Sequence, residues 1–185
     1  TRIHVSFHRS IAIPSSLFVH LITVREADQP FRTTTLKKIP FDFDAVSMYT
    51  SALFHLAIAQ FSNQYYLLHL QRTSPTSAHL STTIRAELRC PPIDQLLNTT
   101  IVNLHIIKRM KFYPLPCHKH AALQCFYDQQ YFCLCELSRR VNCLEFDQNM
   151  TYDGRGYSPC EHAGQCLQDH PLCPTSSFCV CKDCY

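Results

Sequence analysis

The chain has 185 residues, of which 46% are hydrophobic, and a formal net charge of +3 at pH 7. This length suits one medium domain, or one domain plus a small module. Its basic residues occur as separated pairs rather than runs, which argues against nucleic acid or an anionic membrane surface as the partner. No apolar run reaches the roughly 18–20 residues that a membrane-spanning helix needs, so we expect membrane attachment only through regions outside this chain.

The first 89 residues contain no cysteine and mostly alternate apolar with polar residues. Ile3, Val5 and Phe7 alternate with polar neighbours, and the segments SLFVHLITVRE, QYYLLHLQ and HLSTTIRAEL are similarly strand-like. We therefore expect residues 1–112 to form a β-rich extracellular domain, a β-sandwich or a similar antiparallel sheet. The segment AVSMYTSALFHLAIAQF is compatible with one bent strand, two strands or a helix, and helices in some middle segments are the alternative to strands throughout.

Glycine is scarce, because the chain contains three and the first is Gly154. Glycine-rich loops that bind phosphates or dinucleotides are therefore excluded from residues 1–153. Hairpin turns of the Asn-Gly type are excluded there as well. We expect the turns of this region to use Pro, Asn, Asp and Ser.

The segment CPPIDQLLNTTIVNLHIIKRMKFYPLPC, residues 90–117, is predicted to be a short helical connector. Pro91 and Pro92 suit the start of a helix, and Pro114 and Pro116 are expected to end the segment. Beyond it the long apolar runs disappear, and small segments of this kind usually need covalent cross-links. We place a domain boundary between residues 111 and 117.

Eleven of the twelve cysteines lie at or after Cys117. Their density and even total favour a disulfide framework in an extracellular chain, and the glycosylation sequons at Asn98 and Asn149 favour the same compartment. A zinc site built on Cys181 and Cys184 is the first alternative, but C-x-C pairs such as Cys133 and Cys135 fit zinc-ligand spacing poorly. A redox pair at Cys181 and Cys184 is the second alternative, and it lacks the helix that would lower a thiol pKa.

The C-x-C pairs restrict the disulfide pairing. In an extended chain two such cysteines have Cα atoms roughly 6.5–7 Å apart, at the limit of what a disulfide spans. Each cysteine is therefore expected to bond a different partner, typically one earlier and one later in the chain. The pairs concerned are Cys133 with Cys135, and Cys179 with Cys181.

The sequence SPCEHAGQC followed by FCVC resembles an epidermal-growth-factor-like (EGF-like) module over about residues 154–185. The resemblance makes Cys160, Cys166, Cys179 and Cys181 the second to fifth family cysteines, and it implies a Cys160–Cys179 bond. The first family cysteine is missing, and the sixth would lie beyond Tyr185, so we expect a truncated module whose Cys181 lacks its partner.

Other cysteines depart from the family pattern. Cys173 and Cys184 are additional to it, and we expect them to bond each other. Cys166 lacks its usual family partner unless Cys143 substitutes.

Residues 113–150 are interpreted as a cysteine-rich, divergent EGF-like segment that precedes the module of residues 151–185. As a divergent copy of the family, this earlier group of cysteines implies three bonds: Cys90–Cys125, Cys117–Cys133 and Cys135–Cys143.

No catalytic motif accompanies these features. The eleven histidines fall mostly singly, and neither H-E-x-x-H nor G-x-S-x-G is present. Glu145, Asp147 and Asp153 are interpreted as solvated loop residues rather than calcium ligands. We expect no enzyme activity, cofactor or metal.

These observations predict an adhesion or receptor-ectodomain segment of an extracellular or cell-surface protein that binds other extracellular proteins or receptors. The alternatives are an intracellular zinc protein with reduced cysteines and a secreted hydrolase that uses one of the histidines.

Overall fold

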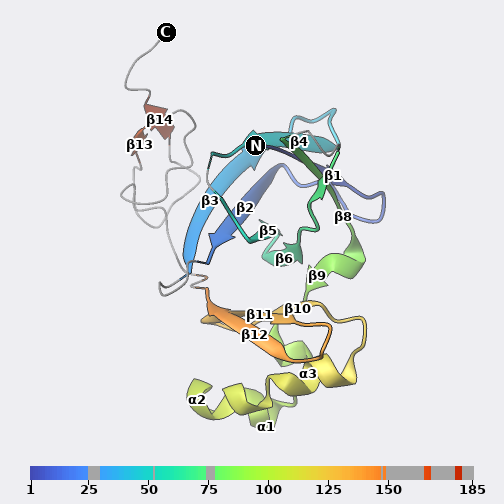
Figure 1. Ribbon diagram of the computed structural model, residues 1–185, viewed down its shortest axis with the longest axis vertical. Coiled ribbons are helices and arrows are strands. Elements are labelled where there is room, and N and C mark those ends of the chain that lie inside the picture. The colour runs from blue at the N-terminus through green and yellow to red at the C-terminus, as the bar shows by residue number, and fades with distance from the viewer. Residues whose placement is uncertain are drawn as a thin grey trace.

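The computed structural model describes residues 1–24, 30–51, 53–73, 78–146, 148, 165–167 and 178–180. The chain is mainly β, as expected. Two sheets built from the first ninety residues pack into a sandwich, a third sheet lies against it, and short helices cover the far side of the third sheet (Figure 1). The described elements thus form successive layers.

The outer sheet of the sandwich has four strands in the order β4-β1-β8-β7. They are β1 (Arg2–Phe7), β4 (Ala45–Tyr49), β7 (Gln71–Arg72) and β8 (His79–Ile84). The expectation of a wholly antiparallel arrangement is wrong at one position, because β1 and β8 are parallel. Parallel neighbours require a long crossover connection, and four of the five strands of the central sheet described next lie within the chain that joins β1 to β8.

The central sheet has five antiparallel strands in the order β3-β2-β5-β6-β9. They are β2 (Ser16–Thr23), β3 (Phe31–Lys38), β5 (Leu56–Phe61), β6 (Gln64–Leu67) and β9 (Arg89–Cys90). The segment AVSMYTSALFHLAIAQF, whose structure the sequence left open, forms two strands, β4 and β5.

Strand β2 explains why the central sheet has long apolar segments. Leu17 and Val19 belong to the core of the sandwich, whereas Ile22 belongs to the core shared with the third sheet. A strand that is buried on both faces needs apolar residues at consecutive positions. Complete burial of each such side chain stabilises the fold by roughly 1.5–3 kcal/mol.

The turn between β5 and β6 shows how the chain forms a tight hairpin without glycine. Ser62 and Asn63 have φ angles of 49° and 57°, and Phe61 pairs directly with Gln64. Positive φ at both turn residues is the geometry that fits the twist of a two-residue hairpin. Asn tolerates this conformation better than most residues, so the expected use of Ser and Asn in turns is confirmed here.

The third sheet, called the cysteine-rich sheet below, has the antiparallel order β10-β11-β12. Its strands are β10 (Cys125–Tyr127), β11 (Tyr131–Cys135) and β12 (Val141–Glu145). Phe126 and Tyr113 pack on the side of the helices, and Phe132 and Phe146 pack towards the central sheet. The sheet is therefore enclosed by apolar contacts on both faces.

The predicted helical connector is present as a series of short helices. They are η2 (Ile93–Gln95), α1 (Thr99–Val102), α2 (Ile106–Arg109), η3 (Met110–Phe112) and α3 (Pro114–Lys119). A further short helix, η1 (Ala86–Leu88), precedes the predicted connector. The expectation that Pro114 and Pro116 end the helical segment is wrong, because Pro114 begins α3. Proline suits the first turn of a helix, where its missing N–H group would have no intrahelical partner.

The connection between the sandwich and the cysteine-rich sheet crosses the predicted domain boundary. Ile58 and Tyr65 of the central sheet share one core with Phe132 and Phe146. The proposed divisions at residues 112 and 150 stay predictions. Near the C-terminus, β13 (Gln165–Leu167) and β14 (Phe178–Val180) form an antiparallel pair.

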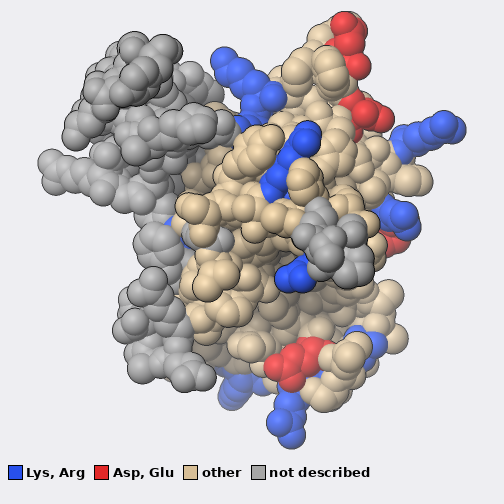
Figure 2. All heavy atoms as spheres, turned by 45° about the horizontal axis from the view of Figure 1, so that its top comes forward, with Lys and Arg blue, Asp and Glu red and all other residues tan. Residues whose placement is uncertain are grey.

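The visible surface agrees with the dispersed charge of the sequence. Figure 2 shows Lys and Arg side chains scattered over the face that it presents, rather than gathered in one patch. No helix in the described parts of the chain is long and apolar enough to cross a membrane.

Candidate functional site

Three disulfides cross-link the layer formed by the cysteine-rich sheet and the helices. They join Cys90 to Cys125, Cys117 to Cys135 and Cys133 to Cys143, with Cα–Cα distances of 4.9, 5.5 and 4.0 Å. The first bond ties β9 of the central sheet to β10, as the sequence led us to expect. The expected bonds Cys117–Cys133 and Cys135–Cys143 are wrong.

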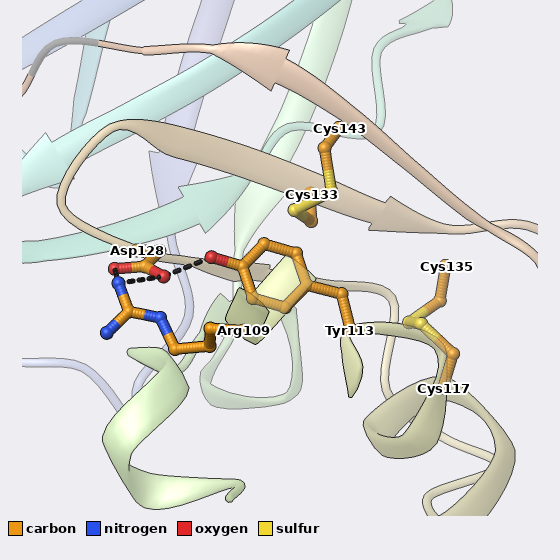
Figure 3. Close-up of a disulfide and its surroundings, with 7 residues drawn as sticks. All are labelled: Arg109, Tyr113, Cys117, Asp128, Cys133, Cys135 and Cys143. Carbon is orange, nitrogen blue, oxygen red and sulfur yellow. Dashed lines mark hydrogen bonds and ion pairs between the residues drawn. A yellow bond between two sulfur atoms is a disulfide. The ribbon is translucent and has the colours of Figure 1, made fainter. Parts of the chain in front are cut away.

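Strand register explains the correction. Cys133 lies directly opposite Cys143 in the pairing of β11 with β12, so these two cysteines bond across the hairpin. Cys135 lies opposite Val141 instead, and its sulfur bonds Cys117 of α3 (Figure 3). The rule that one C-x-C cysteine bonds an earlier partner and the other a later one holds, but the two roles are exchanged.

The remaining predicted bonds fall mostly outside the described residues. Cys160, Cys173, Cys181 and Cys184 lie there, so Cys160–Cys179 and Cys173–Cys184 stay predictions. The backbones of Cys166 and Cys179 are register partners in the β13–β14 pair. Cys143 is bonded to Cys133 and therefore cannot serve as the partner of Cys166.

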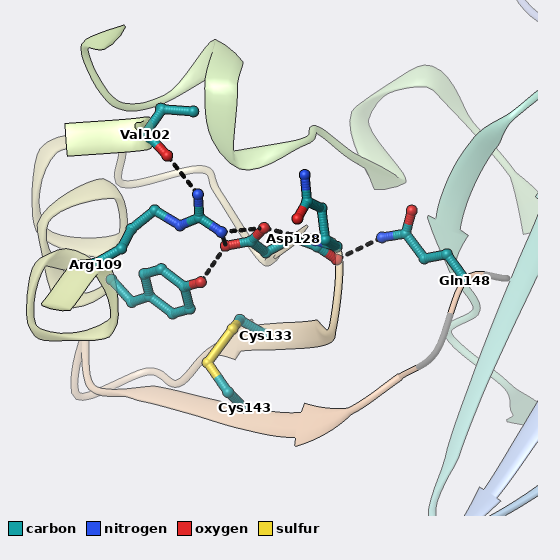
Figure 4. Close-up of polar contacts among 8 residues, drawn as sticks. Val102, Arg109, Asp128, Cys133, Cys143 and Gln148 are labelled. Carbon is teal, nitrogen blue, oxygen red and sulfur yellow. Dashed lines mark hydrogen bonds and ion pairs between the residues drawn. A yellow bond between two sulfur atoms is a disulfide. The ribbon is translucent and has the colours of Figure 1, made fainter. Parts of the chain in front are cut away.

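A buried ion pair lies between the helices and the cysteine-rich sheet. Arg109 of α2 and Asp128, in the turn after β10, are 6% and 4% exposed, and their closest N–O distance is 2.7 Å. The Arg109 guanidinium also donates to the carbonyl oxygen of Val102 at the end of α1 (Figure 4). The pair thus joins three segments that are separated in the sequence.

Tyr113 and the turn backbone are the other partners of the Asp128 carboxylate. The Tyr113 hydroxyl donates to one carboxylate oxygen, and the backbone N–H of Gln129 donates to the other at 2.6 Å. The Tyr113 ring lies between this carboxylate and the disulfides in Figure 3. Burial and the hydrogen bond to Asp128 raise the pKa of Tyr113, so its hydroxyl stays protonated and donating. The enclosed carboxylate of Asp128, which accepts from Arg109, Tyr113 and Gln129, is suited to holding structure.

His20 is the deeply buried histidine of the central sheet. Its Nε2 donates to Oε1 of Gln60 at 2.8 Å, which leaves Nδ1 to accept from the Thr34 hydroxyl at 2.9 Å. Its ring packs edge-on against Phe146. Burial lowers the pKa of His20 to about 4, so the ring is neutral at physiological pH. These contacts give His20 a structural role at the junction of the two sheets.

The sequence-predicted glycosylation sites have different outcomes. Asn98 is exposed at the start of α1, where its Oδ1 accepts a hydrogen bond from the backbone N–H of Ile101. This leaves the side-chain NH2 group, which would carry the glycan, free of the capping role. Asn149 lies outside the described residues.

An exposed aromatic loop is the surface feature that sequence reasoning missed. The loop from Pro40 to Asp44 joins β3 to β4 and carries Phe41, which is 103% exposed, and Phe43, which is 60% exposed. The neighbouring loop between β1 and β2 carries Ile13, and the two loops are linked by the hydrogen bond from the N–H of Ile39 to the carbonyl oxygen of Ser15. The segment PFDFD was the signal in the sequence. It alternates aromatic with acidic residues, and acidic side chains are unfavourable in a buried strand.

Large exposed apolar groups of this kind mark contact surfaces for other molecules. We call the side chains of Ile13, Phe41 and Phe43 the aromatic tip. It lies at one end of the sandwich, on loops held by rigid strands, which is where β-sandwich proteins commonly place binding residues.

The described residues contain no group of three or more His, Cys, Asp or Glu side chains placed to hold a metal ion. All six cysteines from Cys90 to Cys143 are bonded in disulfides, including Cys117 of the sequence Cys117-His118-Lys119-His120. No family model, curated protein or solved structure matches this chain in the comparisons with known proteins.

Proposed function

We propose that this chain is a protein-binding segment of an extracellular or cell-surface protein and that it carries out no catalysis. The observation that carries the proposal is the set of three disulfides within the packed layers. Four of their cysteines, Cys90, Cys117, Cys125 and Cys133, are at most 1% exposed. Intrachain disulfides are more typical of extracellular than of intracellular proteins, because cytosolic thiols are kept reduced.

Residues 151–185 are, in this proposal, an EGF-like module. The support is the sequence resemblance of SPCEHAGQC and FCVC to that family, together with the antiparallel pairing of β13 and β14 around Cys166 and Cys179. Modules of this type act as spacers or as protein-binding surfaces. The exposed Asn98 supports glycosylation of the same chain, since a glycan needs a solvent-facing acceptor.

The aromatic tip is the proposed contact surface. Phe41 and Phe43 alternate with Asp42 and Asp44, which are also exposed. A partner that fits this loop has an apolar pocket for the rings and basic side chains around it. An anionic membrane surface fits less well, because it would repel the two carboxylates.

The thiol state of the protein tests the compartment directly. The full chain is expressed through a secretory pathway and alkylated without reductant, and its intact mass is measured before and after reduction. We expect no alkylation of the six cysteines of the described disulfides, and a gain of about two hydrogen masses per bond on reduction.

The intracellular zinc alternative makes the opposite prediction. If these six cysteines alkylate readily without reductant and the folded protein binds zinc, the extracellular proposal is wrong. Removal of the glycan by a glycosidase provides a second measurement, since a mass loss at Asn98 requires passage through the secretory pathway.

A further inference from the structure

A cleft of about 520 Å³ opens where two of the apolar cores described above meet. Phe54, Leu68, Leu70 and Leu80 line it from the core of the sandwich. Leu67 of β6 and Leu134 of β11 line it from the core that the central sheet shares with the cysteine-rich sheet. The space-filling view is hollowed between the sandwich and the lower layer (Figure 2).

The position and size of the cleft are those of a small-molecule site. Ligand cavities commonly measure about 300–1,000 Å³ and lie between packed layers or domains. Two separate cores supply the walls, so an apolar occupant would bury its surface on both sides. Burial of apolar surface supplies the main favourable contribution to the binding of such a molecule.

The polar groups that line the cleft include a cation, the guanidinium of Arg72. His55, His69 and Arg72 line it and are all exposed, and no Asp or Glu is among the described residues that line it. The Nδ1 atom of His55 accepts a hydrogen bond from the backbone N–H of Val24 at 3.0 Å, so its ring proton is on Nε2, where it can be donated. Arg72 has a planar group that binds a carboxylate through two hydrogen bonds.

We propose that this cleft binds a small molecule with an apolar chain and one carboxylate, of the fatty-acid class. The chain lies against the leucines of the two cores, and the carboxylate lies beside Arg72 and the two histidines. This binding activity is separate from protein recognition by the aromatic tip, because the two surfaces use different residues.

Isothermal titration calorimetry of the full chain with dodecanoate tests the proposal. Dodecanol has the same chain without charge, dodecyltrimethylammonium reverses the charge, and acetate retains only the carboxylate. We expect one dodecanoate per chain, bound about tenfold more tightly than dodecanol. Acetate and the cationic compound should show no saturable binding below millimolar concentration.

Matched substitutions locate the site. Arg72→Glu and Leu53→Glu place a negative charge on exposed residues that line the cleft, and each should weaken dodecanoate binding by at least about tenfold. Arg140→Glu and Leu137→Glu make the same changes on exposed residues of the hairpin between β11 and β12 and should leave binding unchanged. All four positions are exposed, so the variants should fold.

Three outcomes would overturn the proposal. Equal affinity for dodecanoate and dodecanol would show that no charge is recognised. An equal response of the cleft variants and their controls would show that the ligand binds elsewhere. Absence of saturable dodecanoate binding by the folded wild-type chain would show that the cleft takes no ligand of this class.

Discussion

The sandwich and the cysteine-rich layer differ in what holds each of them together. The sandwich contains a single cysteine, Cys90 in its last strand, and its strands bury long apolar segments between two sheets. The cysteine-rich layer has strands of three to five residues, three disulfides and a buried ion pair. Short strands bury little apolar surface, so covalent bonds supply stability that the sandwich obtains from burial.

Reduction of the three disulfides should have the largest effect on stability. It should destabilise the cysteine-rich layer more than the sandwich. Chain-entropy estimates for loops of 10 to 35 residues give about 3–4 kcal/mol per bond. We expect amide hydrogen exchange to lose protection in β11 and β12 after reduction, whereas β2 and β5 stay protected. Simultaneous loss of protection in all four strands would show that the regions unfold as one unit and would break the comparison.

Removal of one member of the buried ion pair should be the next largest effect. Asp128→Ala leaves the Arg109 guanidinium buried without its carboxylate, at an expected cost of about 3–5 kcal/mol in the free energy of unfolding. Urea titration followed by circular dichroism measures this cost. The exposed Asp42→Ala provides the control, with an expected change within about 0.5 kcal/mol.

The double variant Arg109→Met with Asp128→Leu sharpens the test, because it removes both charges and keeps apolar volume. We expect it to recover most of the lost stability. If the double variant is as unstable as Asp128→Ala, the attraction between Arg109 and Asp128 itself stabilises the packing of the helices. The cost of Asp128→Ala would then not be explained by an unpaired buried charge alone.

Acid should weaken the junction between the two regions through His20. The pKa of His20 is about 4 in the folded protein and near 6.5 in the unfolded chain. The unfolded chain therefore takes up a proton between these values while the folded protein does not, and stability falls as the pH drops from about 6.5 to 4. The expected loss approaches about 3 kcal/mol.

His20→Gln should remove this part of the pH dependence, because glutamine keeps hydrogen-bonding groups but does not titrate in this range. The measurement is urea unfolding at several pH values, with the exposed His4→Gln as the control. An equal slope in the wild type and in His20→Gln would assign the acid sensitivity to other groups.

Local pattern predicted the strands of the sandwich well, and physical reasons explain where it failed elsewhere. Alternation at Ile3, Val5 and Phe7 reports the pleat of a strand directly. The choice between Cys133 and Cys135 as the partner of Cys143 depends on the register of a hairpin, and a shift of two residues would reverse it while keeping the same side-chain face.

The polar cluster around Asp128 and the apolar cleft could not be predicted from local sequence pattern. Arg109 and Asp128 are 19 residues apart, and no spacing rule for a helix or a strand brings such residues together. The cleft joins Leu80 of the outer sheet to Leu134 of the cysteine-rich sheet, so it exists only after the layers pack. The exposure of Phe41 was easier to predict from the sequence. In PFDFD the aromatic residues have acidic neighbours, and these carboxylates need contact with solvent.

The aromatic tip should give the smallest effect on stability and a large effect on binding. Phe41→Ser with Phe43→Ser removes rings that are largely in solvent, so the free energy of unfolding should change by less than about 0.5 kcal/mol per site. The measurement is the binding of the full chain to an array of purified extracellular proteins. The wild type and the double variant are each applied as oligomers, and their binding is compared. A partner of the wild type should bind the double variant at least about tenfold more weakly.

The control for this experiment is Leu137→Ser, which removes an equally exposed apolar side chain from the hairpin between β11 and β12. If Leu137→Ser weakens binding and the tip variant does not, the partner contacts the cysteine-rich layer. The division of roles would then be reversed, because the region held by disulfides would also be the recognition surface and the sandwich would be its support. If only the tip variant weakens binding, the sandwich presents the partner surface and the disulfides fix the layer behind it.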